Sequence, residues 1–147
     1  MGEFRRIEGL AAVHVEPILA ERCAAVLGSG WQKAQLAGEA WAYVDGAVAR
    51  GIGGLEPIWP GRLALWSYTG TLTAGDWKRV LRFTRLRLAR AIEVPGTNRI
   101  EATALLDDPK YAGFLSRLGL KVEGRLCGYT PQGQAVDLFS MIPERVA

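Results

Sequence analysis

The sequence predicts a mixed α+β (α/β mixed) domain built on a mostly antiparallel central sheet, with helices on both faces. Three observations favour this class: a two-residue hairpin signal in the first half, one long amphipathic helix in the middle, and a second hairpin at the end. In chain order the expected elements read β-α-α-β-β-β-α-β-α-β-β. With 147 residues, one domain over residues 1–147 is expected, because domains commonly hold about 100–150 residues.

Two helices are expected between the first strand and the first hairpin. Pro17 suits the first turn of a helix, and Gly28-Ser29-Gly30 ends it. A second short helix is expected from Trp31 to Ala37. The apolar residues that recur at helical spacing in the first helix are Ile18, Leu19, Cys23, Val26 and Leu27.

The hairpin signal is Asp45-Gly46, which lies between two alternating runs. Such a two-residue turn needs positive φ at both central positions, so Trp41–Val44 and Ala47–Ile52 are expected to pair as antiparallel strands. Gly53-Gly54 and Pro57 are expected to end or bulge the second strand. The run RLALWSYTG, residues 62–70, predicts the next strand.

The longest helix is expected to begin after Thr73. Thr73 and Asp76 have the spacing of a capping box, with Asp in place of the usual Glu. The helix ends at Val94-Pro95-Gly96. Its apolar side is Trp77, Val80, Leu81, Thr84, Leu88, Ala91 and Ile92, and its basic residues are Lys78, Arg79, Arg82, Arg85, Arg87 and Arg90.

The last third predicts a strand, a short helix and a hairpin. Residues 98–106 (NRIEATALL) form the strand, and a helix from Asp108 to Leu118 is closed by Gly119. The runs Lys121–Tyr129 and Ala135–Met141 are expected to pair around the turn TPQG.

Composition excludes several classes of protein. About half of the residues are apolar (49%) and the net charge is +3, which is ordinary for a globular intracellular domain. No apolar run approaches the roughly 20 residues of a membrane-spanning helix, and no signal peptide is expected. The two cysteines and the single histidine, His14, have no zinc spacing. We therefore expect a cytoplasmic protein without a metal site.

The second half of this pattern resembles the GCN5-related N-acetyltransferase (GNAT) superfamily. The resemblance covers roughly Ala40 to Met141 and is strongest from Asn98 onward, where a strand, a short helix, Gly119-Leu120 in place of Gly-Phe, and Glu123-Gly124 precede the final hairpin. The runs GRLALWSYTG and WKRVLRFTRLRLARAI also look like acetyltransferase-like proteins of tailed phages and prophages. The resemblance implies a sheet that the terminal hairpin completes and that opens around acetyl-CoA.

The resemblance also implies where the cofactor pyrophosphate binds. The superfamily usually has Arg or Gln, two residues, Gly, one residue, then Gly or Ala between the central strand and the long helix, whereas this chain reads SYTGTLTAGDWKRV without that Arg or Gln. Backbone N–H groups at a helix start suit phosphates, while Asp76 places a carboxylate there. The candidate cofactor-binding residues are Ser67, Tyr68, Thr69, Gly70, Thr71, Thr73, Ala74, Gly75, Asp76, Trp77, Lys78 and Arg79.

This chain lacks one of the catalytic residues that the resemblance implies. The superfamily's proton donor is a tyrosine a few residues before Gly-Phe, and the matching residue here is Leu115. Tyr111 lies one turn earlier and is either a substitute acid or a packing residue. Glu56 and Glu101 are candidate bases, or carboxylates that are solvated or ion-paired.

Together these features predict an acetyl-CoA-dependent N-acyltransferase acting on an amine of a protein or small molecule. The alternative is a non-catalytic protein of the same fold, associated with a phage virion or with a phage or host partner, since fold does not fix function. A nucleic-acid-binding domain is a third hypothesis, which rests only on the basic helix. Homodimers are common in the superfamily, so exchange or pairing of the final strand between two copies is a further expectation.

Overall fold

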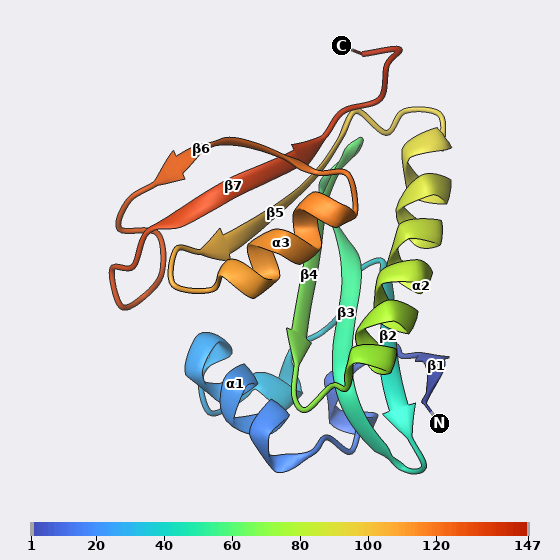
Figure 1. Cartoon of the computed structure of the whole chain (residues 1–147), viewed down its shortest axis with the longest axis vertical. Coiled ribbons are helices and arrows are strands. Elements are labelled where there is room, and N and C mark those ends of the chain that lie inside the picture. The colour runs from blue at the N-terminus through green and yellow to red at the C-terminus, as the bar shows by residue number, and fades with distance from the viewer. Residues whose placement is uncertain (1, 147) are drawn as a thin grey trace. The chain divides into compact units, whose positions relative to one another are not determined.

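The computed structural model describes residues 2–146 and confirms the predicted class, a mixed α/β fold with one seven-stranded sheet (Figure 1). The strand order across the sheet is β1-β2-β3-β4-β5-β7-β6. The strands are β1 (Glu3–Arg6), β2 (Glu39–Asp45), β3 (Val48–Trp59), β4 (Arg62–Thr69), β5 (Arg99–Leu105), β6 (Lys121–Leu126) and β7 (Val136–Met141). The helices are α1 (Pro17–Leu27), α2 (Ala74–Glu93) and α3 (Pro109–Arg117), with two 3-10 turns, η1 (Leu10–Ala12) and η2 (Trp31–Lys33).

The sheet is mostly antiparallel, as the sequence predicts. The pairs β1–β2, β2–β3, β5–β7 and β6–β7 are antiparallel, and β4–β5 is parallel. The parallel ladder joins Arg62–Ala64 to Arg99–Glu101 and ends there. Both predicted hairpins therefore pair within one sheet.

The chain divides into two compact units. The N-terminal unit holds the residues up to Glu56 together with Leu65–Val80, and the C-terminal unit holds Pro57–Ala64 together with the residues from Leu81 onward. The predicted single domain over residues 1–147 stays a prediction.

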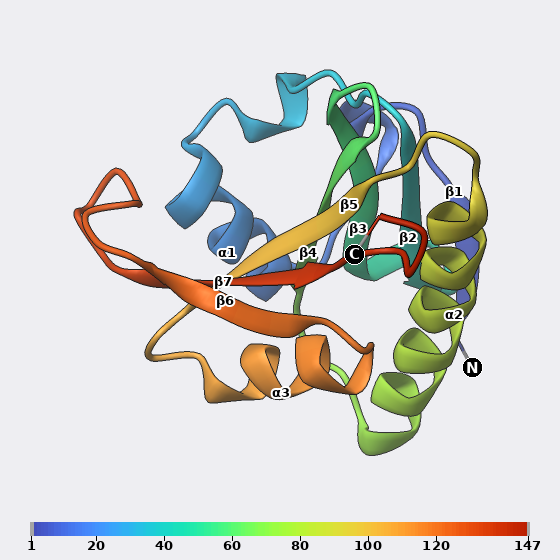
Figure 2. The same cartoon turned by 90° about the horizontal axis from the view of Figure 1, so that it is seen from above.

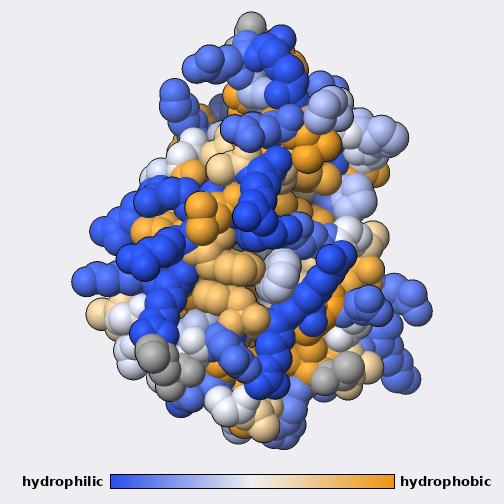
Figure 3. Space-filling view, turned by 90° about the vertical axis from the view of Figure 1, so that its right-hand side faces the viewer, coloured by the Kyte–Doolittle hydropathy of each residue, from blue (hydrophilic) through white to orange (hydrophobic). Residues whose placement is uncertain are grey.

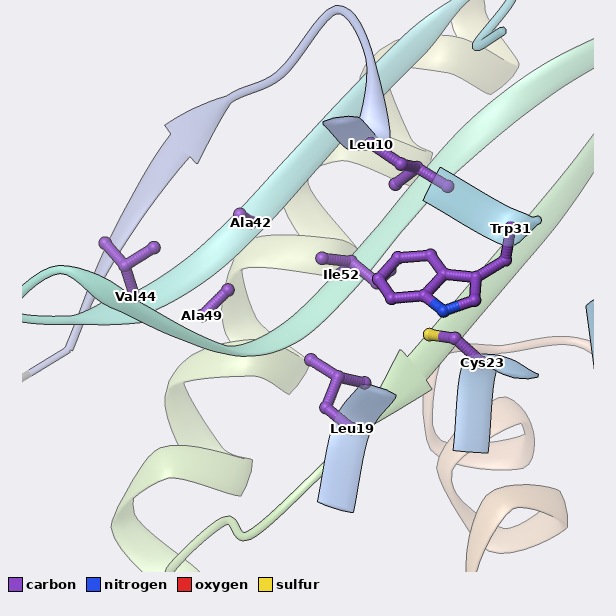
Figure 4. Packing of buried hydrophobic residues seen from close by; sticks show 8 residues of the cluster. All are labelled: Leu10, Leu19, Cys23, Trp31, Ala42, Val44, Ala49 and Ile52. Atoms are coloured by element: carbon purple, nitrogen blue, oxygen red, sulfur yellow. The ribbon is translucent and has the colours of Figure 1, made fainter. Parts of the chain in front are cut away.

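The core of the N-terminal unit lies between α1, the two 3-10 turns and one face of β2 and β3 (Figure 4). The Trp31 ring lies beside Ile52 and Cys23. Full burial of a side chain of the size of leucine contributes about 1.5–3 kcal/mol. The eight buried residues of this cluster are Leu10, Leu19, Cys23, Trp31, Ala42, Val44, Ala49 and Ile52.

The first hairpin forms one residue later than the sequence predicts. Asp45 pairs with Val48, so Gly46 and Ala47 are the central residues of the turn. Only Gly46 has positive φ, at 66°, which fits the two-residue turn that requires glycine at its first central position. A register shift between Tyr43 and Val44 accompanies this turn.

Two other expectations for this half of the chain are wrong in detail. The helix expected from Trp31 to Ala37 is only the 3-10 turn η2, because one turn is enough to bury Trp31 and the backbone is extended again at Ala34. β3 runs through Gly53-Gly54 and Pro57 to Trp59 instead of ending at either. A Cβ at Gly54 would collide with the carbonyl oxygen of Glu39, so glycine permits the close approach of β2.

In the C-terminal unit, α3 lies alongside the part of the sheet formed by β5, β7 and β6 (Figure 2). Its end is a Schellman motif: the Gly119 N–H donates to Ser116 O (3.0 Å), and the Leu120 N–H donates to Leu115 O (3.1 Å). Gly119 has a φ of 97°, which a residue with a Cβ rarely adopts. The predicted glycine cap is therefore confirmed, and β6 begins two residues later.

Candidate functional site

The loop between β4 and α2 is closed by the predicted capping box. The Thr73 N–H donates to Asp76 Oδ2 (2.9 Å), and the Asp76 N–H donates to Thr73 Oγ1 (3.1 Å). Each side chain thus satisfies a backbone donor that the start of a helix leaves without a partner. The sequence pattern is confirmed, with Asp in the position usually held by Glu.

A buried tyrosine fixes the second oxygen of Asp76. Tyr43 Oη donates to Asp76 Oδ1 (2.6 Å), and Phe4 of β1 packs against the Tyr43 ring at 4.9 Å between centroids. The hydrogen bonds from Tyr43 and from Thr73 lower the pKa of Asp76. Burial, and then the hydrogen bond to Asp76, raise the pKa of Tyr43. Asp76 is accordingly an ionised carboxylate held at both oxygens.

Helix α1 and the residue before it also form hydrogen bonds to this loop, which the sequence pattern does not predict. Glu16, the residue before α1, accepts a hydrogen bond from the Thr71 N–H at its Oε1. Arg22 donates from Nη1 to Thr69 O (2.5 Å) and Gly70 O (3.4 Å). The separation of about 50 residues between these partners explains why no local motif marks them.

The other candidate cofactor residues divide by their surroundings. Tyr68 is half-buried and packs against the core of the N-terminal unit, where burial raises its pKa. A Cβ added at Gly75 would meet only Thr73 Oγ1, at 3.7 Å, so the backbone there is open to approach. The half-buried candidates are Ser67, Tyr68, Thr69, Gly70, Asp76 and Trp77, and the exposed ones are Thr71, Thr73, Ala74, Gly75, Lys78 and Arg79.

The loop's donor set suits a phosphate group. Ala74 and Gly75 are the first two residues of α2, and the first four N–H groups of a helix have no partner within it. The positive end of the 20-residue α2 dipole points the same way. These donors, with the Thr71 N–H, are the ones that fit a pyrophosphate, although Thr71 is engaged by Glu16.

The basic residues of α2 lie on its solvent side. Figure 3 faces the side of the molecule that carries α2 and shows hydrophilic side chains spread among hydrophobic ones. Arg87 is half-buried, and Arg85 donates from Nη2 to Arg117 O (2.8 Å). The exposed members are Lys78, Arg79, Arg82, Arg85 and Arg90. A solvated face and a surface that binds phosphates or nucleic acid both require exposed basic side chains, so both interpretations stay predictions.

On α3, the residue that replaces the expected tyrosine is part of the core. Leu115 is 0% exposed, and its neighbour Phe114 is also buried. Tyr111 is half-buried, and its ring stacks on Phe114 with centroids 6.0 Å apart. Its backbone N–H donates to Asp108 Oδ1 (3.1 Å), which caps the helix. This geometry favours the packing interpretation of Tyr111, whose role as an acid stays a prediction.

The two candidate bases have different environments. Glu56 is exposed on β3. The strand β3 meets the candidate loop at Arg50, whose carbonyl oxygen accepts the Gly70 N–H (2.8 Å). Glu56 lies roughly 20 Å further along the extended strand. Glu101 is 7% exposed and is ion-paired to Arg62 and Arg99. Burial alone would raise the pKa of Glu101, but the hydrogen bonds from both arginines outweigh it and lower the pKa. Glu101 is therefore an ion-paired carboxylate, and Glu56 remains the candidate base of the two.

Neither metal ligands nor membrane spans are found in the part of the chain that the structure describes. No group of three or more His, Cys, Asp or Glu side chains there has the arrangement of a metal site. None of the helices within residues 2–146 is long and apolar enough to cross a membrane.

Sequence comparisons give no relatives: no family model and no curated protein matches the chain. Solved structures do match. The ribosomal-protein-S5-alanine acetyltransferase of Vibrio fischeri is 15% identical, with a TM-score of 0.69 over 99% of this chain and 95% of the other. The IAA acetyltransferase of Bacillus cereus is 12% identical, with a TM-score of 0.66 over 97% of this chain and 99% of the other.

The class of fold follows from these likenesses. An acetyltransferase of the GNAT family from Bacillus anthracis also matches, with 10% identity and a TM-score of 0.58 over 70% of this chain and 65% of the other. The chain thus has the fold of the GNAT acetyltransferases, as the sequence pattern predicts. At these identities the likeness defines the fold alone.

Proposed function

We propose that this protein is an acetyl-CoA-dependent N-acyltransferase that acts on an amine. One observation carries the proposal: in a fold shared with acetyltransferases, β4 leads through a short loop with half-buried Gly70 and exposed Thr71 and Thr73 into the N-terminus of the long helix α2. Unbonded N–H groups and the helix dipole make such a terminus attractive to phosphates.

The residues of this loop bind the cofactor. The N–H groups of Thr71, Ala74 and Gly75 hold the pyrophosphate, and the exposed Lys78 and Arg79 lie one turn further along α2. Acetyl-CoA held there would supply a thioester: its C–S bond would break as the amide C–N bond forms, and coenzyme A would leave with the proton that the amine loses passing to the thiolate or to water. The open backbone at Gly75 supports this assignment.

The proposed enzyme lacks the usual tyrosine that donates a proton to the leaving thiolate, so we expect slow turnover. Leu115 has no proton to donate, and general acid–base assistance typically contributes about 10²–10⁴-fold. Holding the two reactants together still accelerates transfer. Tyr111→Phe tests the remaining candidate: with Tyr111 as a packing residue, kcat changes by less than about threefold. A loss of 100-fold or more would make Tyr111 the acid.

Calorimetry with acetyl-CoA tests cofactor binding directly. Ala74→Pro removes one N–H donor at the first position of α2. Proline is favoured at the first position of a helix, as at the start of α1 and α3, so we expect the variant to fold. We expect at least a tenfold weaker Kd for this variant. Ala74→Gly keeps the N–H and is the matched control. Equal affinity in both variants would place the phosphate elsewhere.

A second candidate is a non-catalytic protein of the same fold. The carboxylate of Glu16 on the loop and the buried Leu115 favour it. It predicts that no acetyl-CoA binds in calorimetry and that no amine from a panel of peptides, lysine derivatives and polyamines is acetylated. Further proposals rest on sequence resemblance. They are a phage or prophage origin, a place in the virion or the host cytoplasm, a protein partner and a homodimer.

A further inference from the structure

The loop assigned above to the pyrophosphate already carries a carboxylate of the chain itself. Glu16 Oε1 accepts the hydrogen bond from the Thr71 N–H. The same oxygen fills the space beside Gly70, since a Cβ on that glycine would collide with it. One donor of the loop and the adjoining space are therefore occupied by Glu16.

The backbone of Glu16 is fixed by two hydrogen bonds, whereas its carboxylate accepts a single one. The Glu16 N–H donates to Ala49 O (3.0 Å), and Glu16 O accepts from the Ala20 N–H (3.0 Å). Within residues 2–146, the Thr71 N–H is the one hydrogen-bond partner of the carboxylate. Rotation about the side-chain torsions is enough to withdraw it without moving α1.

Asp76, the other carboxylate at the loop, behaves differently. Its two oxygens are bonded to the Tyr43 hydroxyl (2.6 Å) and the Thr73 N–H (2.9 Å). It is part of the structure of the α2 terminus and has no freedom to leave. Of the two carboxylates, Glu16 is the displaceable one.

We propose that Glu16 is an autoinhibitory group that competes with a phosphate anion for the Thr71 N–H. The proposed function supplies the identity of that anion, the pyrophosphate of acetyl-CoA. One N–H cannot serve both acceptors at full strength, and two anions this close repel each other. The carboxylate must therefore swing away before the loop binds its ligand, and removing its charge strengthens binding.

Inorganic pyrophosphate is the first probe, because it tests the competition without the rest of the cofactor. We expect Glu16→Gln to bind pyrophosphate about tenfold more tightly than the wild type, equal to about 1.4 kcal/mol, with the NMR signal of the Thr71 amide shifting on binding. Glu16→Ala should act in the same direction. Glu21→Gln, which removes an exposed charge from α1, should match the wild type. Equal affinities in all proteins, no binding to any, or an equal gain in Glu21→Gln would overturn the inference.

Coenzyme A is the second probe, and it separates this inference from the proposed function. Tighter binding of coenzyme A by Glu16→Gln supports both. A gain for pyrophosphate without binding of coenzyme A to any variant keeps the competition and removes the acyltransferase. Equal affinity of the wild type and Glu16→Gln for coenzyme A overturns the competition while the acyltransferase stands. Thermal unfolding of each variant confirms that the comparison is made on folded protein.

Discussion

At the scale of single residues, Tyr43 links the sheet to the start of α2. It is 3% exposed, and its hydroxyl bonds an ionised carboxylate. Hydrogen bonds to charged groups contribute about 1.5–3 kcal/mol, and partial exposure of Asp76 reduces this. Tyr43 is therefore expected to stabilise the loop as well as fill the sheet face opposite α1.

Tyr43→Phe should lower the free energy of unfolding by about 1–2 kcal/mol at pH 7. The bond lowers the pKa of Asp76, so its contribution is present above the ordinary value of 3.8 and is lost as the pH falls through the lower folded-state pKa. Urea unfolding at pH 7 and pH 3 checks both points. Tyr129→Phe changes an exposed tyrosine and should have no effect. An equal loss at both pH values would mean that the hydroxyl acts independently of the Asp76 charge.

Leu115 offers a second test at this scale. Restoring the tyrosine of similar enzymes by Leu115→Tyr looks attractive from sequence, yet the side chain is fully buried. We expect the larger ring to destabilise the protein by about 1–3 kcal/mol by overpacking, without a gain in acetyl transfer. Leu115→Met, which nearly preserves volume, is the control. A faster enzyme of unchanged stability would show that this position faces a ligand.

At the scale of elements, the C-terminal end of α2 is held by Arg145. Its guanidinium donates to the carbonyl oxygens of Ile92 (3.1 Å), Val94 (3.0 Å) and Thr97 (2.6 Å). The last carbonyl groups of a helix have no partner within it, and a cation there also complements the helix dipole. One residue near the end of the chain thus caps the longest helix.

Arg145→Ala should lower the free energy of unfolding by about 1–2 kcal/mol and speed hydrogen exchange in the last turn of α2. The control is Arg125→Ala, which breaks an exposed ion pair with Asp137 that is expected to contribute at most about 1 kcal/mol. If both variants lose the same stability with unchanged exchange in α2, the cap is not a significant contributor.

Local signals predict most elements, and contacts distant in sequence account for what they miss. The capping box at Thr73, the glycine cap at Gly119 and both hairpins follow from spacings of a few residues. The first turn is displaced by one residue because the pairing of β2 with β3, including its bulge, decides which two residues are central in the turn. These are Gly46 and Ala47 instead of Asp45 and Gly46. At the candidate site, Gly70 and Ala74 are visible in the sequence, whereas Glu16 reaches the loop only through the folded chain.

At the scale of the whole molecule, carboxylates in both units are more acidic than in an unfolded chain. Besides Asp76, the network Arg62–Glu101–Arg99–Glu123 joins β4, β5 and β6 in the C-terminal unit. The hydrogen bond from Arg99 lowers the pKa of Glu123 from 4.5 to about 2. With a net charge of +3 at pH 7, protonating these groups also increases the repulsion among the cations.

Stability should therefore decline in acid. Each of these carboxylates has a lowered folded-state pKa, so its contribution is complete above its ordinary pKa and is lost as the pH falls through the lower folded-state pKa, which is about 2 for Glu123. We expect the urea midpoint to fall steeply over this range and to vary little between pH 5 and 7. Glu123→Gln should lower stability at pH 7 by about 1 kcal/mol or less, since the pair is partly exposed. Its difference from the wild type should shrink as the pH falls toward about 2 and vanish below it, where Glu123 is protonated in the folded state. Glu21→Gln, with no such partner among the described residues, should follow the wild-type curve throughout. A constant gap between Glu123→Gln and the wild type down to pH 2 would mean that packing, and not the ion pair with Arg99, explains the effect.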